Sequence, residues 1–131
     1  MNTEYAEIIS MLIAAIKTKA KIDGKARSTA FLSNKQFDRV EKLTNQVLKM
    51  PNWMKAFVQM SSSEDDCVAV HAIDVLMRKK ALKGKIRDEC ILRVIRYAND
   101  SGLAGLTYSL VLNSWGVNML NKDKPNFHGR V

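Results

Sequence analysis

The sequence predicts an all-α fold, a single-domain bundle of five or six helices with a flexible C-terminal tail. Apolar residues recur at helical spacing along most of the chain. Only two prolines and six glycines interrupt it, and 47% of the 131 residues are hydrophobic, which is enough to form a core. We therefore expect a helical domain over residues 1–121 and a flexible basic tail over residues 122–131.

The first two helices are predicted from their apolar stripes and from the residues at their ends. In residues 3–24, acids occupy the first turn and lysines the last, which is the order that the helix dipole favours, and Gly24 is a stop signal. The second helix is predicted to begin where Ser33 and Gln36 have capping-box spacing, and to end at Pro51. The predicted buried positions are Tyr5, Ile8, Ile9, Leu12, Ile13 and Ile16 in the first helix and Phe37, Val40, Leu43 and Val47 in the second.

Three more helices follow. A short apolar segment, 52–60, precedes the clearest helix, 61–84, in which a serine cap and three acids open the helix and four basic residues and Gly84 close it. Its middle, Val68–Met77, is apolar nearly all round, which is typical of a helix at the centre of a bundle. A fifth helix is predicted over 85–102. Its expected inward residues are Ile86, Cys90, Ile91, Val94 and Ala98, and Arg87, Arg93 and Arg96 are expected to be more exposed.

The last element has an ambiguous pattern. Apolar and polar residues alternate from Leu106 to Asn113, as in a strand, but the apolar residues are also compatible with a helix. A lone strand would leave its backbone groups unpaired, and no other segment reads as a partner strand. We therefore predict a helix here.

The end of this element resembles a known enzyme family. Asn113-Ser114-Trp115-Gly116 is similar to the Asn-Ser-Trp-Gly segment of papain-like proteases. In that family a strand ends in an Asn that orients the catalytic His, and the Trp shields the pair. The resemblance covers nine residues of the 131 and implies a cysteine protease only if a Cys and a His accompany it.

The rest of the chain does not supply that pair. Cys67 and Cys90 both follow acids, in "EDDCVAV" and "RDECILR", and acids disfavour a thiolate. His71 precedes Asn113 by 42 residues and His128 follows it, whereas the family's His lies shortly before the Asn. We interpret the match as chance and predict that the protein is not an enzyme.

Two other side-chain sets are candidate chemical sites. Cys67, His71 and Asp74 share one helical face in the order of a catalytic relay. We instead interpret them as a core Cys and a partly buried His with Asp74 as its hydrogen-bond acceptor. Adding Cys90 and His128 gives a Cys2His2 set, but its spacing matches no short zinc-ligand pattern. With no P-loop, dinucleotide fingerprint or HExxH motif, we predict no catalytic residue, cofactor or metal.

Charge is the remaining signal, because the formal net charge is +8 and the pI is about 9.7. Positive residues concentrate in two segments at helix ends, the 78–87 segment and the 17–27 segment, which could lie together at one end of a bundle. Such cations complement the helix dipole, or they form a surface for phosphates or an acidic protein. The candidate contact residues are Arg78, Lys79, Lys80, Lys83, Lys85 and Arg87 in the first segment and Lys17, Lys19, Lys21, Lys25 and Arg27 in the second.

Residues 57–77 have the outline of a helix-turn-helix. Two helices joined by a short polar turn fit its outline, but the second would present three acids, residues 64–66, to DNA. Because those acids would repel phosphates, we expect any DNA contact to come from the basic segments instead.

The leading hypothesis is a non-enzymatic basic binding protein associated with nucleic acid or a nucleic-acid-handling complex. The alternative is a small inhibitor or immunity-type protein that docks on an acidic protein surface without binding nucleic acid. The acidic N-terminus lacks the basic region of a signal peptide, and two distant cysteines fit a reducing compartment, so we expect a cytoplasmic protein without a membrane span. Four large apolar residues are candidate core residues or partner anchors: Trp53, Met54, Phe57 and Trp115.

Overall fold

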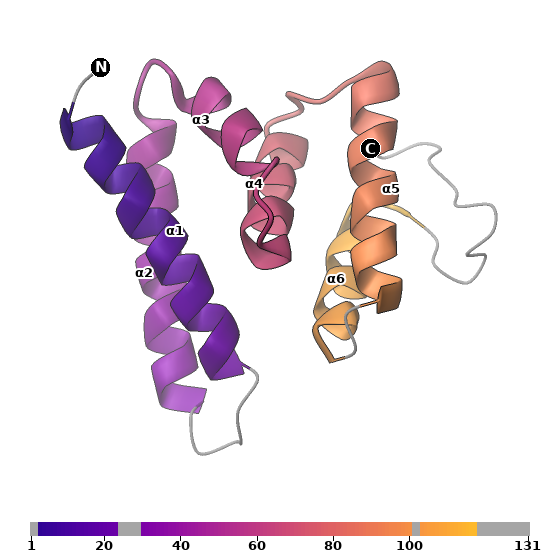
Figure 1. Ribbon diagram of the computed structural model, residues 1–131, viewed down its shortest axis with the longest axis horizontal. Helices are drawn as coiled ribbons and strands as arrows, with labels where there is room; N and C mark the ends of the chain where they lie inside the picture. The colour runs from indigo at the N-terminus through magenta and orange to yellow at the C-terminus, as the bar shows by residue number, and fades with distance from the viewer. Residues whose placement is uncertain (1–2, 24–29, 101–102, 118–131) are drawn as a thin grey trace. The chain divides into compact units, whose positions relative to one another are not determined.

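The computed structural model describes residues 3–23, 30–100 and 103–117 (Figure 1). Within these ranges the chain forms six helices and no strand, so the predicted all-α class is confirmed. Residues 122–131, the predicted tail, lie outside the described residues, as does the predicted domain boundary at residue 121. The helices are α1 (Thr3–Asp23), α2 (Ala30–Leu48), α3 (Trp53–Met60), α4 (Asp66–Arg78), α5 (Gly84–Asp100) and α6 (Leu103–Ser114).

The chain divides into two compact units, Met1–Ala72 and Ile73–Val131, which we call unit 1 and unit 2. The boundary falls inside α4, so this helix contributes its first half to unit 1 and its second half to unit 2. Among the described residues, no helix has both the length and the apolar character needed to cross a membrane.

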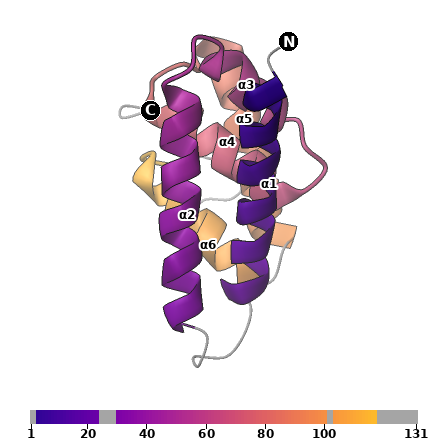
Figure 2. The same ribbon diagram turned by 90° about the vertical axis from the view of Figure 1, so that its left-hand side faces the viewer.

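Unit 1 is built on the antiparallel pair α1 and α2, which lie side by side in both ribbon views (Figures 1 and 2). The predicted stripes supply buried residues from both helices, followed by residues from α3 and the start of α4. The buried positions include Leu12, Ile16, Val40, Leu43, Val47, Phe57, Met60 and Val68.

Three predictions for α2 are wrong. The helix begins at Ala30, three residues before the proposed Ser33 cap, and it ends at Leu48 before Pro51 is reached. Phe37 is half exposed rather than buried, and the Lys19 ammonium lies 6.0 Å from the centroid of its ring. The ring therefore packs at the edge of the α1–α2 pair, where a lysine from α1 covers its face.

Unit 2 has α5 and α6 packed against each other, with the Tyr97 and Tyr108 ring centroids 6.4 Å apart. Cys90, Ile91 and Val94 are buried, as predicted, along with residues from the second half of α4. Ile86 is 63% exposed, contrary to prediction, because α5 begins only two residues earlier and its first turn lies outside the core. The ambiguous segment from residue 106 to 113 is helical, as predicted, within α6.

The start of α4 also differs in detail from the prediction. Asp65, rather than a serine, is the capping residue, since its carboxylate accepts hydrogen bonds from the backbone N–H groups of Cys67 (2.9 Å) and Val68 (3.2 Å). The hydroxyl of Ser63 in turn accepts from the backbone N–H of Asp65, at 3.1 Å. Asp65 thus satisfies two of the backbone donors at the start of α4 that have no partner within the helix.

Candidate partner-binding surface

The 78–87 segment comprises the last residue of α4, the connection 79–83 and the first turn of α5. The end of α4 fixes the backbone where the connection begins. The N–H of Ala81 donates to the carbonyl of Leu76 at 2.9 Å, and the N–H of Lys80 donates to that of Met77 at 3.0 Å. This pair of bonds is a Schellman motif, and Lys80 occupies its left-handed position with a φ of 55°. The prediction that Gly84 ends α4 is wrong. The helix ends at Arg78, and Gly84, six residues further on, begins α5.

The two arginines of the segment are held by carboxylates. Arg78 donates to Asp74 through both Nε, at 2.9 Å, and Nη2. The other carboxylate oxygen of Asp74 accepts a hydrogen bond from the indole Nε1 of Trp115 at 2.9 Å, inside unit 2. Arg87 is paired with its neighbour Asp88 at 3.2 Å. Both guanidinium groups are therefore already paired with carboxylates of this protein.

The interpretation of Asp74 as the acceptor for His71 is wrong, because the Asp74 carboxylate bonds Arg78 and Trp115 instead. The Nε2 atom of His71 lies 3.0 Å from the hydroxyl of Thr44, which joins α4 to α2 in unit 1. Both groups are polar and partly or fully buried, so this hydrogen bond removes the cost of burying them unpaired.

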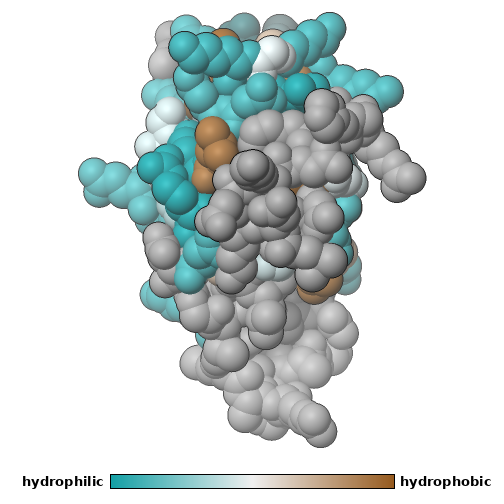
Figure 3. All heavy atoms as spheres, turned by 90° about the vertical axis from the view of Figure 1, so that its right-hand side faces the viewer, coloured by the Kyte–Doolittle hydropathy of each residue, from teal (hydrophilic) through white to brown (hydrophobic). Residues whose placement is uncertain are grey.

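The four lysines of the segment are exposed, as is the paired Arg78. We call Lys79, Lys80, Lys83 and Lys85 the lysine quartet. Their ammonium groups form no ion pair with any described residue. Unit 2 carries 11 lysines and arginines against 5 acids, a net charge of +6, whereas unit 1 carries 10 against 8, a net of +2. Figure 3, which looks onto the side of α5, shows mostly hydrophilic side chains wherever the atoms are not grey.

The 17–27 segment belongs to unit 1, at the end of α1. Lys17 and Lys21 are exposed, and Lys19 is half-buried beside Phe37. Lys25 and Arg27 lie outside the described residues. The 17–27 segment is in unit 1 and the 78–87 segment is in unit 2. That the two segments form a common surface stays a prediction.

The stretch that resembles a papain-like segment forms the end of α6 in this chain. Its last N–H groups repeat the Schellman pattern, with Val117 donating to Leu112 and Gly116 donating to Asn113, both at 3.0 Å. Gly116 has a φ of 83°, which suits a residue without a Cβ. Trp115 is buried, so its role in the fold is packing and the hydrogen bond to Asp74.

The other predicted anchors divide between the core and the surface. Phe57 is fully buried, Trp53 is half-buried, and Met54 is 47% exposed. Met54 is thus the most exposed of these four large apolar residues.

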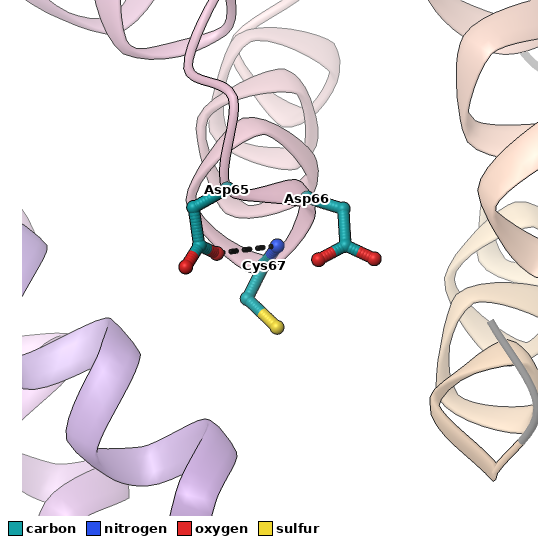
Figure 4. A group of neighbouring side chains, drawn as sticks. All are labelled: Asp65, Asp66 and Cys67. Carbon is teal, nitrogen blue, oxygen red and sulfur yellow. Dashed lines mark hydrogen bonds between the residues drawn. The ribbon is translucent and has the colours of Figure 1, made fainter.

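One group of three potential metal ligands occurs in the described part of the chain: Asp65, Asp66 and Cys67 at the start of α4 (Figure 4). The Asp65 carboxylate already accepts two backbone hydrogen bonds, so capping accounts for its position. Cys90, from the considered zinc set, lies in unit 2, where burial raises the pKa of its thiol, and His128 lies outside the described residues. A buried thiol with a raised pKa is a poor thiolate donor.

The Asp74 cluster is the feature that sequence reasoning missed. The spacing of Asp74 and Arg78, four residues apart on a helix, is a signal for an ion pair that could have been used. The bond to Trp115 spans 41 residues, and no pattern in the sequence indicates it.

No family model, curated protein or solved structure matches this chain.

Proposed function

We propose that this chain is a non-enzymatic binding protein whose lysine quartet contacts the phosphates of a nucleic acid. The observation that supports the proposal is four exposed lysines between residues 79 and 85 that make no ion pair with a described residue, in a unit of net charge +6. Two cysteines that are widely spaced in the sequence fit a reducing compartment, so we infer a cytoplasmic location.

The side chains favour backbone contact over base reading. A lysine ammonium is a compact point charge that pairs with phosphate without a fixed geometry, whereas an arginine reads guanine through two parallel hydrogen bonds. Arg78 and Arg87 are paired with Asp74 and Asp88, so the groups best suited to base reading are already engaged. We therefore expect binding that depends strongly on salt and weakly on sequence.

A protein partner is the second candidate, and one observation favours it. Ile86 is 63% exposed and lies within the 78–87 segment, next to Lys85. An apolar residue surrounded by cations suits an acidic protein surface, since the charges speed association while a buried apolar anchor slows dissociation.

A charge-reversal experiment tests the first proposal. The variant Lys80→Glu, Lys83→Glu, Lys85→Glu is compared with Lys35→Glu, Lys42→Glu, Lys49→Glu, which makes the same charge change at exposed lysines of unit 1. Labelled duplex and single-stranded DNA and RNA are titrated at several salt concentrations. We expect the first variant to abolish binding and the control to keep most of it, with both folded, because exposed charges contribute little to stability.

The salt dependence identifies the partner class. For a nucleic acid, the logarithm of the wild-type affinity should fall linearly with the logarithm of salt concentration, by about 0.7–0.9 per phosphate contacted. If wild-type protein binds neither duplex nor single-stranded DNA or RNA near physiological salt, the first proposal is rejected. The second candidate would then be established by an acidic protein, isolated from lysate, that binds the wild type but does not bind the Ile86→Asp variant. If wild-type protein binds nucleic acid and the triple variant binds it as tightly as the control does, the lysine quartet is not the contact and the first proposal is rejected.

A further inference from the structure

Unit 1 contains a groove that the proposed function does not use. It has a volume of about 810 Å³ and lies between α1, the connection from α2 to α3, and α3 itself, with its last wall from the start of α4. This volume falls within the range of about 300–1,000 Å³ that is typical of small-molecule sites. The apolar part of its wall consists of Ala6, Ile9, Ile13, Met50, Pro51, Ala56, Met60 and Val68.

One edge of the groove is bridged by a hydrogen bond. The hydroxyl of Tyr5 donates to the backbone carbonyl of Asn52 at 2.9 Å, and both residues line the groove. From Tyr5 to Ile13, the first and last lining residues of α1, the groove follows the helix for about 12 Å at 1.5 Å per residue. Because the bridge crosses one end of this stretch, the groove suits a chain that stops there better than a peptide helix that must continue past it.

The charge of the lining indicates the head group of the occupant. Lys55 is the one charged residue among the described lining residues, and its side chain is exposed. No carboxylate is found among the described lining residues, and their polar remainder consists of hydroxyl and amide groups such as Ser10 and Gln59. A lysine at the rim of an apolar wall keeps its ammonium in water while its stem covers apolar surface. This pairing of an apolar wall with a single cation complements an apolar chain that carries one negative charge.

We propose that this groove binds an amphipathic small molecule with an unbranched apolar chain and a single carboxylate head. The chain lies against Ile9, Ile13 and Met60, and the carboxylate pairs with the ammonium of Lys55. The site is in unit 1 and the lysine quartet is in unit 2, so this proposal stands whatever the partner of the quartet is.

Calorimetric titration of the full chain with dodecanoate, below its micelle concentration, tests the proposal. Dodecanol and dodecyltrimethylammonium are the matched probes, with the same chain and a neutral or positive head. We expect dodecanoate to bind with one-to-one stoichiometry and at least about tenfold more tightly than either, because only it pairs with the cation. Absence of binding at millimolar dodecanoate, or equal binding of the three probes, overturns the proposal.

Two pairs of variants test whether the ligand binds in this groove. Ser10→Trp fills the groove from an exposed position of α1, and Val58→Trp adds the same bulk at an exposed position of α3 that does not line the groove. Lys55→Gln removes the cation, and Lys49→Gln removes an exposed lysine that does not line the groove. We expect the groove variants to weaken dodecanoate binding by about tenfold or more and the controls to leave it unchanged. Binding that survives Ser10→Trp in a folded protein rejects the groove as the site.

Discussion

The ends of α4 and α6 use the same backbone hydrogen bonds but different residues. At the end of α6, Gly116 takes the left-handed position with a φ of 83°, whereas at the end of α4 that position is held by Lys80 with a φ of 55°. A residue with a Cβ loses about 1–2 kcal/mol in this conformation and glycine does not. The α6 end is thus the more favourable one, and the α4 end combines a strained backbone with an exposed ammonium group.

The two ends are also joined to each other through one side chain. Asp74, on α4, accepts hydrogen bonds from Arg78 in the last turn of its own helix and from Trp115 just beyond the end of α6. Each end therefore depends on a shared buried carboxylate, and variants can separate the contribution of that carboxylate from the contributions of the two turns.

The largest effect is expected for Asp74→Ala. Loss of the carboxylate leaves the buried indole N–H of Trp115 without its acceptor and frees Arg78, so we expect the free energy of unfolding to fall by about 2–3 kcal/mol. Denaturant unfolding measures this change. Asp88→Ala is the control, because its pair with Arg87 is partly exposed and should contribute less than about 1 kcal/mol. Equal effects of the two variants would mean that the cluster does not join the helix ends.

A smaller loss is expected for Gly116→Ala. Alanine must adopt the left-handed backbone conformation of Gly116, which costs a residue with a Cβ about 1–2 kcal/mol. Thermal or denaturant unfolding should show that loss in the free energy of unfolding. Ser114→Ala, two residues earlier and exposed, is the comparison, since it changes no left-handed residue. A Gly116→Ala protein as stable as the wild type would contradict the assigned turn.

The smallest effect, and one of opposite sign, is expected for Lys80→Gly. Glycine removes the Cβ strain at this position, although it also removes a cation that is favourable near a helix C-terminus, so we expect a gain of about 0.5–1 kcal/mol. The same change at the neighbouring Lys79, which has no positive φ, should not stabilise the protein. Unfolding midpoints of the two variants, measured side by side, decide between these outcomes.

Lys80→Gly also separates stability from binding. If the lysine quartet contacts a partner, this variant should bind more weakly while unfolding at a higher temperature. A variant that is both more stable and fully active would show that the strained lysine makes no contact with the partner.

Much of the fold could be predicted from the sequence because apolar periodicity reports directly on helices. It gave the helical class and most buried positions, including Val40 and Ile91. The helix ends were predicted less well, since glycine and capping-box patterns are only the commonest solutions. Gly84 was expected to end α4, but Lys80 takes the left-handed position, and α2 begins ahead of the Ser33 pattern.

The candidate surface could be predicted only as a set of charges. The sequence locates six cations between residues 78 and 87 but does not say which are already paired. Arg78 is engaged through Asp74, which also bonds a tryptophan 41 residues away, and such a contact depends on how α4 and α6 pack. The groove beside Lys55 escaped prediction for the same reason, since its walls come from segments that are separated in the sequence.

The position of the unit boundary inside α4 has a consequence for amide hydrogen exchange. A fragment ending at Ala72 would keep only residues 66–72 of this helix, which is too short to be stable alone. The N–H groups in the middle of α4 are bonded within the helix and surrounded by fully buried side chains such as Ala69, Ile73 and Leu76. These amides should exchange only when the helix opens as a whole, and they should be among the last in the chain to take up deuterium.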